Sequence, residues 1–312
     1  MSKFRLVFVG VVVWWGLCVG PVAQGFVDDG TALSFGHFPL LYPTGTSCRS
    51  GTEPGLLSMP SLYFGWLDQP RDSTWALQRR TSTGTAPWSL KGFWLEATEE
   101  VPLDQGLGLL VSGGVFFPGQ ASGTWYTTPL SRSFDFDIPS YDWWFVDGLV
   151  EGRVSGPIDL LAGVRWDHTS TRVDYSDNTS DDYILNSYMA LVGAQIKQPF
   201  LVGSLLVRLL YSPLVRGQLR YHFWDRLGYA EFGDFRVNSN SSFVETLADY
   251  RIKLRGDVQI GGFAKWNWLR VRTDDQNLSG LTTESVSWAV DIRSWTVGGV
   301  VLLQFFQFFL ID

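Results

Sequence analysis

The chain has 312 residues, a formal net charge of −7 at pH 7, and 15 tryptophans and 33 glycines. An acidic chain is a poor candidate for nucleic-acid binding. Its three histidines (His37, His168 and His222) are far apart, so we expect no metal site and no cofactor. No apolar run after residue 25 approaches the ~20 residues of a spanning helix, which excludes a helical inner-membrane protein and leaves a soluble β protein or a barrel.

Residues 1–25 have the pattern of a cleaved secretory signal peptide. Lys3 and Arg5 precede an uncharged apolar run from Leu6 to Val19, and Ala23-Gln24-Gly25 is an acceptable cleavage site. Cleavage takes away two positive and no negative charges, so the net charge of the mature chain becomes −9. An uncleaved anchor is the alternative, but roughly 14 apolar residues are short for a spanning helix.

Cysteine usage gives little structural constraint. A lipoprotein anchored through Cys18 is a further alternative, although Trp15-Gly16-Leu17 is a poor recognition sequence for one. If Cys18 leaves with the signal peptide, Cys48 has no partner in the chain and no intrachain disulfide forms.

Two segments show the alternation of a half-polar strand. In 158–167 the even positions from Ile158 to Trp166 are apolar, and most odd positions are polar or glycine. Segment 258–268 repeats the pattern and ends on Trp266 and Trp268. Period-two alternation over about ten residues that ends in tryptophan is typical of a membrane strand with lipid outside and a polar lumen inside. A soluble sandwich strand, the alternative, has the same pattern.

The connections decide between these alternatives, because from residue 142 they alternate between short and long. Tight turns are expected at 155–157, 197–199 and 255–257, and long polar stretches at 169–183, 212–242 and 272–284. Outer-membrane barrels have short periplasmic turns and long extracellular loops. The expected strands lie near 57–67, 86–97, 107–117, 142–154, 158–168, 184–196, 200–211, 243–254, 258–271 and 285–306. We therefore predict an all-β, transmembrane, antiparallel up-and-down barrel of about ten strands.

The last strand, 285–306, needs a bulge on this interpretation. Its apolar residues lie at even positions from Val286 to Ile292 and at odd positions from Val301 to Phe305. One inserted residue near 294–299 restores a single lipid face. We assign residues 26–56 to a periplasmic or plug-like segment, 57–306 to the barrel and 307–312 to a C-terminal tail.

The strand cores resemble the omptins, a family of outer-membrane proteases with ten-stranded barrels. The similar segments are Ser89-Leu90-Lys91-Gly92, Tyr188 to Gly193, the turn at 197–199, Leu209 to Ser212, and Asp257 to Asn267. The resemblance implies a site in which an acidic pair and an Asp-x-His pair hold the water that attacks the peptide bond. Asp135 and Asp137 match the acidic pair, and His222 lies where the family places its histidine.

The second half of that motif is incomplete. Two positions before His222 stands Arg220, and an arginine cannot accept the imidazole proton that the family's aspartate accepts. Asp225 is three residues beyond His222 and points away from it in an extended segment. Asp167 and His168 are adjacent, so one faces the lumen and the other faces outward.

The resemblance also implies contacts with lipopolysaccharide phosphates, for which Arg216, Arg220 and Arg226 are the candidates. The other expected partners are outer-membrane lipid, the barrel-assembly machinery during biogenesis, and a peptide or host ligand at the outer loops. We expect a bacterial outer-membrane protein with a structural, binding or adhesion role and without standard omptin proteolysis. An endopeptidase with a rearranged Asp/His site and a small channel are the alternatives.

Overall fold

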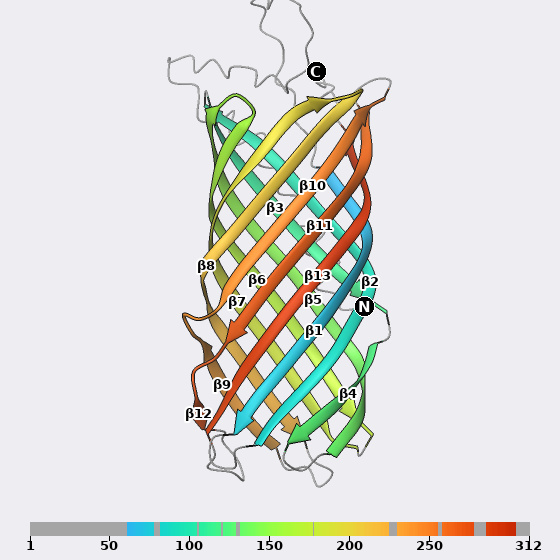
Figure 1. Cartoon of the computed structure of the whole chain (residues 1–312), viewed down its shortest axis with the longest axis vertical. Helices are drawn as coiled ribbons and strands as arrows, with labels where there is room; N and C mark the ends of the chain where they lie inside the picture. The colour runs from blue at the N-terminus through green and yellow to red at the C-terminus, as the bar shows by residue number, and fades with distance from the viewer. Residues whose placement is uncertain are drawn as a thin grey trace, which may run out of the picture.

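Ten long antiparallel strands close into a barrel in the computed structural model (Figure 1). The structure describes residues 61–77, 82–104, 106–119, 121–128, 132–176, 178–224, 230–254, 258–277 and 285–303. The ten strands are β1 (Ser61–Leu77), β2 (Ser82–Asp104), β3 (Leu107–Pro118), β5 (Arg132–Ser155), β6 (Ile158–Tyr175), β7 (Ser180–Phe200), β8 (Gly203–Trp224), β10 (Ser242–Lys253), β11 (Val258–Arg272) and β13 (Ser285–Leu303). Because β1 pairs with both β2 and β13, the sheet has no open edge here, and the predicted barrel is confirmed.

Three short strands extend the wall at one end of the barrel. β4 (Ala121–Thr128) follows β3 and pairs with β2 and β5, and β9 (Ala230–Val237) pairs with β8 beyond the end of β10. β12 (Gln276–Asn277) pairs with β13 beyond the end of β11. We call this end of the barrel, where β6 connects to β7 and β8 to β9, the mouth (lower end in Figure 1).

The wall extends into two of the stretches that the sequence analysis assigned to loops. β6 and β7 take up most of 169–183, and β8 and β9 take up much of 212–242. The turn expected at 197–199 is also wrong, since β7 continues to Phe200 and the chain turns at Leu201, where φ is 53°. Pro199 is tolerated in a strand because it lies near the strand's end.

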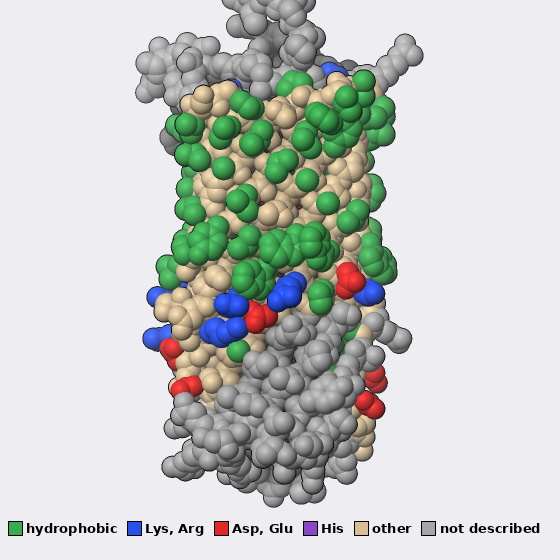
Figure 2. Space-filling model, in the orientation of Figure 1, with side chains coloured by type: hydrophobic (Ala, Val, Ile, Leu, Met, Phe, Trp, Pro, Cys, Tyr) green, Lys and Arg blue, Asp and Glu red, His purple; other side chains and the backbone are tan. Residues whose placement is uncertain are grey.

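The outer surface has an apolar band that ends before the mouth. On β6 the outward side chains of Ile158, Leu160, Val164 and Trp166 are 40–65% exposed, as expected for lipid contact. Towards the mouth, the outward side chains on the same strand become charged, in the pair Arg172–Asp174. Figure 2 shows this change across one face of the barrel, with a row of large hydrophobic side chains directly above charged ones. We call the apolar zone the lipid band.

The bulge expected in the last strand is absent. β13 pairs with β1 and β11 in uninterrupted register over Val286–Leu302 and Ala289–Leu303. Val286, Trp288 and Ile292 are 2–6% exposed and belong to the interior, while Trp295 and Val297 face outward at 56% and 62% exposure. The even positions of β13 therefore face inward along the whole strand. Near the mouth these inward residues are apolar, as in the core of a soluble protein.

Residues 1–60 and 304–312 lie outside the described residues. The signal peptide, the segment 26–56, Cys48 and the C-terminal tail therefore stay predictions. Within the described ranges, no helix is long and apolar enough to cross a membrane.

Candidate functional site

Six charged side chains fill the lumen at the level of the lipid band. Lys265 lies 2.8 Å from Glu96 and 3.2 Å from Glu245, and Arg165 lies 2.8 Å from Glu245 and also pairs with Asp147. Arg208 lies 3.4 Å from Glu245. All six side chains are at most 3% exposed. We call this set of three cations and three carboxylates the lumen charge network.

The network joins opposite walls of the barrel. Its members come from β2, β5, β6, β8, β10 and β11, and two of its cations, Arg165 and Lys265, also pack on aromatic rings. The Arg165 guanidinium carbon lies 4.3 Å from the centroid of Phe145 and 4.8 Å from that of Phe243. The network holds equal numbers of opposite charges, so it has no excess charge with which to select an ion.

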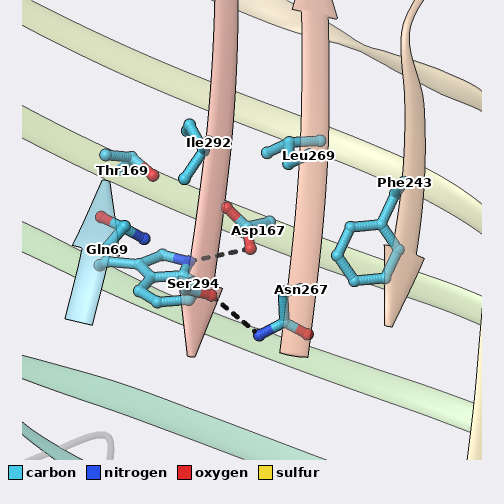
Figure 3. A pocket seen from close by; sticks show the side chains of 9 residues that line it. Gln69, Asp167, Thr169, Phe243, Asn267, Leu269, Ile292 and Ser294 are labelled. Atoms are coloured by element: carbon cyan, nitrogen blue, oxygen red, sulfur yellow. Dashed lines mark hydrogen bonds between the residues drawn. The ribbon is translucent and has the colours of Figure 1, made fainter. Parts of the chain in front are cut away.

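A small cavity lies beside the network, on the side towards the mouth (Figure 3). Its volume is about 10 Å³, and Gln69, Asp167, Thr169, Asn267 and Ser294 contribute its polar lining. The Trp143 indole donates to Asp167 over 3.0 Å, and the Asn267 amide donates to Ser294 over 3.3 Å. A volume of this size is close to the minimum for one water molecule.

Towards the mouth the interior changes from charged to apolar. Buried side chains from six strands lie there, and we call them the mouth core: Phe136, Val173, Leu185, Leu219, Phe235, Val286 and Trp288. Each is at most 5% exposed. One carboxylate, Asp181, lies among them and is 4% exposed. The barrel therefore has a polar lumen at the level of the lipid band and an apolar interior where it extends beyond the lipid band.

Asp135 and Asp137 lie within β5 rather than in a loop before it, and both are exposed on the outer face. Their neighbours Phe136 and Ile138 are 4% and 6% exposed and face inward. The pairing of β5 with β6 shifts between Asp137 and Ser140, which is a bulge at Pro139. This bulge reverses the alternation, so the two carboxylates face outward instead of into the lumen.

A second bulge has the same effect on His222. On β8 the buried residues Leu210 and Ser212 are at even positions, whereas Val215 and Leu219 are at odd ones. The register between β7 and β8 shifts in this region, between Ala190 and Val192. His222 is therefore an exposed residue of the outer face of β8, opposite Asp182 of β7.

The structure does not bring the candidate catalytic residues together. Asp135 and Asp137 are on β5 and His222 is on β8, with β6 and β7 between them. Three inter-strand spacings of ~4.8 Å separate them by roughly 14 Å. No single water can bridge that distance at hydrogen-bond length. The expectation for Asp167 and His168 is confirmed, since Asp167 is 3% exposed in the lumen and His168 faces outward, where it contacts Asn186 at 2.7 Å.

The candidate lipid-binding arginines have different positions. Arg216 and Arg220 are exposed on the outer face of β8, and Arg220 pairs with Asp234 at 3.3 Å. Arg226 lies outside the described residues. The sequence analysis missed an outward set on β11 and β13: Arg270, Arg272 and Arg293, with Asp291 3.2 Å from Arg270 and 2.9 Å from Arg272. We call it the arginine patch.

The arginine patch and Asp181 differ in how far the sequence could have revealed them. Arg270 and Arg272 continue the even-numbered outward face of Trp266 and Trp268, so strand parity alone places them just beyond the lipid band. The Arg270 guanidinium carbon lies 4.9 Å from the centroid of Trp268. Asp181 carries no comparable signal, because its burial depends on tyrosines from three strands.

Comparison with known proteins gives a fold and no closer relationship. No protein-family model and no curated protein sequence matches the chain. Among solved structures, the outer membrane protease OmpT of Escherichia coli is similar with a TM-score of 0.57 and 9% identity, over 79% of this chain and 97% of that one. The translocator domain of autotransporter NalP from Neisseria meningitidis has a TM-score of 0.34 at 12% identity, over 81% and 90%. OprG from Pseudomonas aeruginosa has a TM-score of 0.33 at 9% identity, over 80% and 98%.

The similarity to OmpT, together with ten closed antiparallel strands, bears out the expected omptin-like fold. Identity of 9% transfers no activity. The chain is a closed, ten-stranded antiparallel β-barrel with the fold of the outer membrane protease OmpT.

Proposed function

We propose that this barrel is a structural, binding or adhesion protein of the outer membrane and has no omptin-type proteolytic activity. The observation that carries the proposal is the composition of the mouth core. Among the described residues no histidine faces the lumen, since His168 and His222 both point outward. Proteolysis by the omptin route needs a general base in reach of the attacking water, and an apolar core leaves no place for that water.

The small channel, one of the alternatives, has less support. The lumen charge network and the mouth core lie one after the other in the described part of the interior, and the cavity beside the network has a volume close to the minimum for one water molecule. These features support a function at the outer faces and connections, which agrees with a binding or adhesion role.

A cleavage assay tests the proposal. Purified barrel in detergent with lipopolysaccharide is given a fluorogenic dibasic peptide, with OmpT as the positive control. We expect no cleavage above the rate without protein. Cleavage that disappears in both Asp135→Ala and His222→Ala would instead establish an endopeptidase with a rearranged Asp/His site.

We also propose that phosphates of lipopolysaccharide bind the arginine patch together with Arg216. The patch is adjacent to the lipid band, and three guanidinium groups against the one carboxylate of Asp291 leave a net positive charge. Guanidinium groups bind phosphate bidentately, and Trp268 supports the Arg270 side chain. Figure 2 shows Lys and Arg side chains gathered directly below the row of large hydrophobic ones.

Arginine substitutions test this contact. Arg270→Gln with Arg272→Gln is expected to weaken lipopolysaccharide binding about tenfold, which corresponds to roughly 1.4 kcal/mol of lost charge-assisted bonding. Arg172→Gln is the matched control, because Arg172 is equally outward but lies farther from the lipid band and pairs with Asp174. Binding is measured by retention of labelled lipopolysaccharide on immobilised barrel, and equal loss in both proteins contradicts the assignment.

A further inference from the structure

One carboxylate in the mouth core joins three strands through tyrosines. Asp181 of β7 accepts hydrogen bonds from the hydroxyl groups of Tyr175 on β6 (2.6 Å), Tyr183 on β7 (2.8 Å) and Tyr221 on β8 (3.0 Å). The rings of Tyr183 and Tyr221 pack against Trp288 of β13, with centroids 5.5 and 5.0 Å away. Asp181 and its tyrosines therefore connect one wall of the mouth to the opposite wall.

Among the residues that the structure describes, no cation forms an ion pair with Asp181. The groups that act on its titration are the hydroxyls of Tyr175, Tyr183 and Tyr221 and the carboxylate of Asp182. Phe235 of β9 and Phe136 of β5 complete the shell with hydrocarbon, through ring contacts to Trp288 and Tyr175. A charged carboxylate in such surroundings keeps its hydrogen bonds but loses most of its hydration.

This cluster lies beyond the lipid band. The exposed large hydrophobic residues of β7 end at Tyr188, and Asp181 lies seven residues from it towards the mouth. Burial raises the pKa of Asp181 from 3.8 to about 6, even though the three tyrosine hydrogen bonds lower it. The carboxylate therefore titrates in a range of pH that the outside of a bacterium reaches.

We propose that Asp181 and its three tyrosines form a proton-sensitive seal, which closes the mouth more firmly in mild acid than at neutral pH. Opening exposes Asp181 to water and returns its pKa towards the ordinary value of 3.8. The closed state then holds more protons than the open state between these two values, so falling pH favours closure. The equilibrium constant for opening therefore increases about tenfold when the pH rises from 5 to 8.

Thiol labelling of a mouth-core position measures the opening. Leu185 is 5% exposed on the same inward face of β7, so Leu185→Cys reacts with a water-soluble thiol reagent only when the mouth opens. The full chain carries this change with Cys18→Ser and Cys48→Ser, with and without Asp181→Asn. At each pH, the labelling rate of the protein with Asp181 is divided by the rate of the protein with Asp181→Asn. Both rates depend equally on the ionisation of the thiol, so this ratio removes that effect. We expect the ratio to rise about tenfold from pH 5 to pH 8.

Two further variants make the test specific to the seal. Asp182→Asn removes the same charge one residue away, and we expect it to keep the tenfold rise. Tyr221→Phe removes one donor to the carboxylate, so we expect faster labelling than in the unchanged cluster at pH 8, whether or not Asp181→Asn folds. A ratio that stays flat from pH 5 to pH 8, or labelling at pH 8 that Tyr221→Phe leaves unchanged, overturns the proposal.

Discussion

Replacing Glu245 with glutamine is expected to lower the free energy of unfolding by about 3–5 kcal/mol, because it breaks a buried ion-pair network on one side only. Glu245 contacts Arg165, Lys265 and Arg208 at 2.8, 3.2 and 3.4 Å. The amide leaves these three buried cations with two carboxylates, Asp147 and Glu96. An uncompensated charge in the lumen has neither water nor a partner to stabilise it.

The measurement is equilibrium unfolding in urea from lipid vesicles, followed by tryptophan fluorescence and by the gel mobility of the folded barrel. Asp174→Asn is the control, since it removes a carboxylate from the exposed Arg172–Asp174 pair and is expected to change stability by about 0–1 kcal/mol. Combining Glu245→Gln with Lys265→Met restores charge balance and should recover part of the loss. A cost below ~1 kcal/mol for Glu245→Gln means that the network does not hold the walls together.

Strand alternation within the lipid band made most of the fold predictable. Arg165, Glu245 and Lys265 each lie at the lumen-facing parity of a predicted strand, and all three belong to the lumen charge network. The rule works there because lipid outside and buried charge inside impose opposite polarities on the two faces of a strand. The count of ten strands came from the alternation of short and long connections.

The same rule fails beyond the lipid band. Val286 and Trp288 were expected to face lipid because they are apolar, yet they lie in the mouth core. With water outside, an apolar side chain faces inward, as in any soluble β-barrel. One sequence does not show at which residue the surroundings change from lipid to water, so the sequence analysis placed a bulge in β13, which has none, and missed those in β5 and β8.

The two bulges that reverse the faces of β5 and β8 have a sequence signal. Pro139 in β5 and Pro213 in β8 each lie inside a long strand, where proline typically marks a bulge or an edge. Parity counted across these prolines places Asp135, Asp137 and His222 outward. The burial of Asp181 under three tyrosines depends on how three strands pair. The alternation of residues within a single strand therefore cannot predict it.

β5 and β8 reverse their inward and outward faces at bulges between the lipid band and the mouth, and the outward positions of Asp137 and His222 depend on this reversal. Cysteines at neighbouring positions test it, in the background of Cys18→Ser and Cys48→Ser. Asp137 and His222 are exposed, whereas Phe136 and Leu219 are each 4% exposed. A buried thiol reacts only through local opening, so we expect it to be labelled at least about a hundredfold more slowly than an exposed one.

The decisive measurement is therefore the rate at which a water-soluble thiol reagent labels four single variants of the folded barrel. We expect fast labelling of Asp137→Cys and His222→Cys, at the rate of a free thiol, and slow labelling of Phe136→Cys and Leu219→Cys. Fast labelling of Phe136→Cys and Leu219→Cys with protection of the other two would contradict this expectation. That result would return Asp137 and His222 to the lumen, where an omptin-type site needs them.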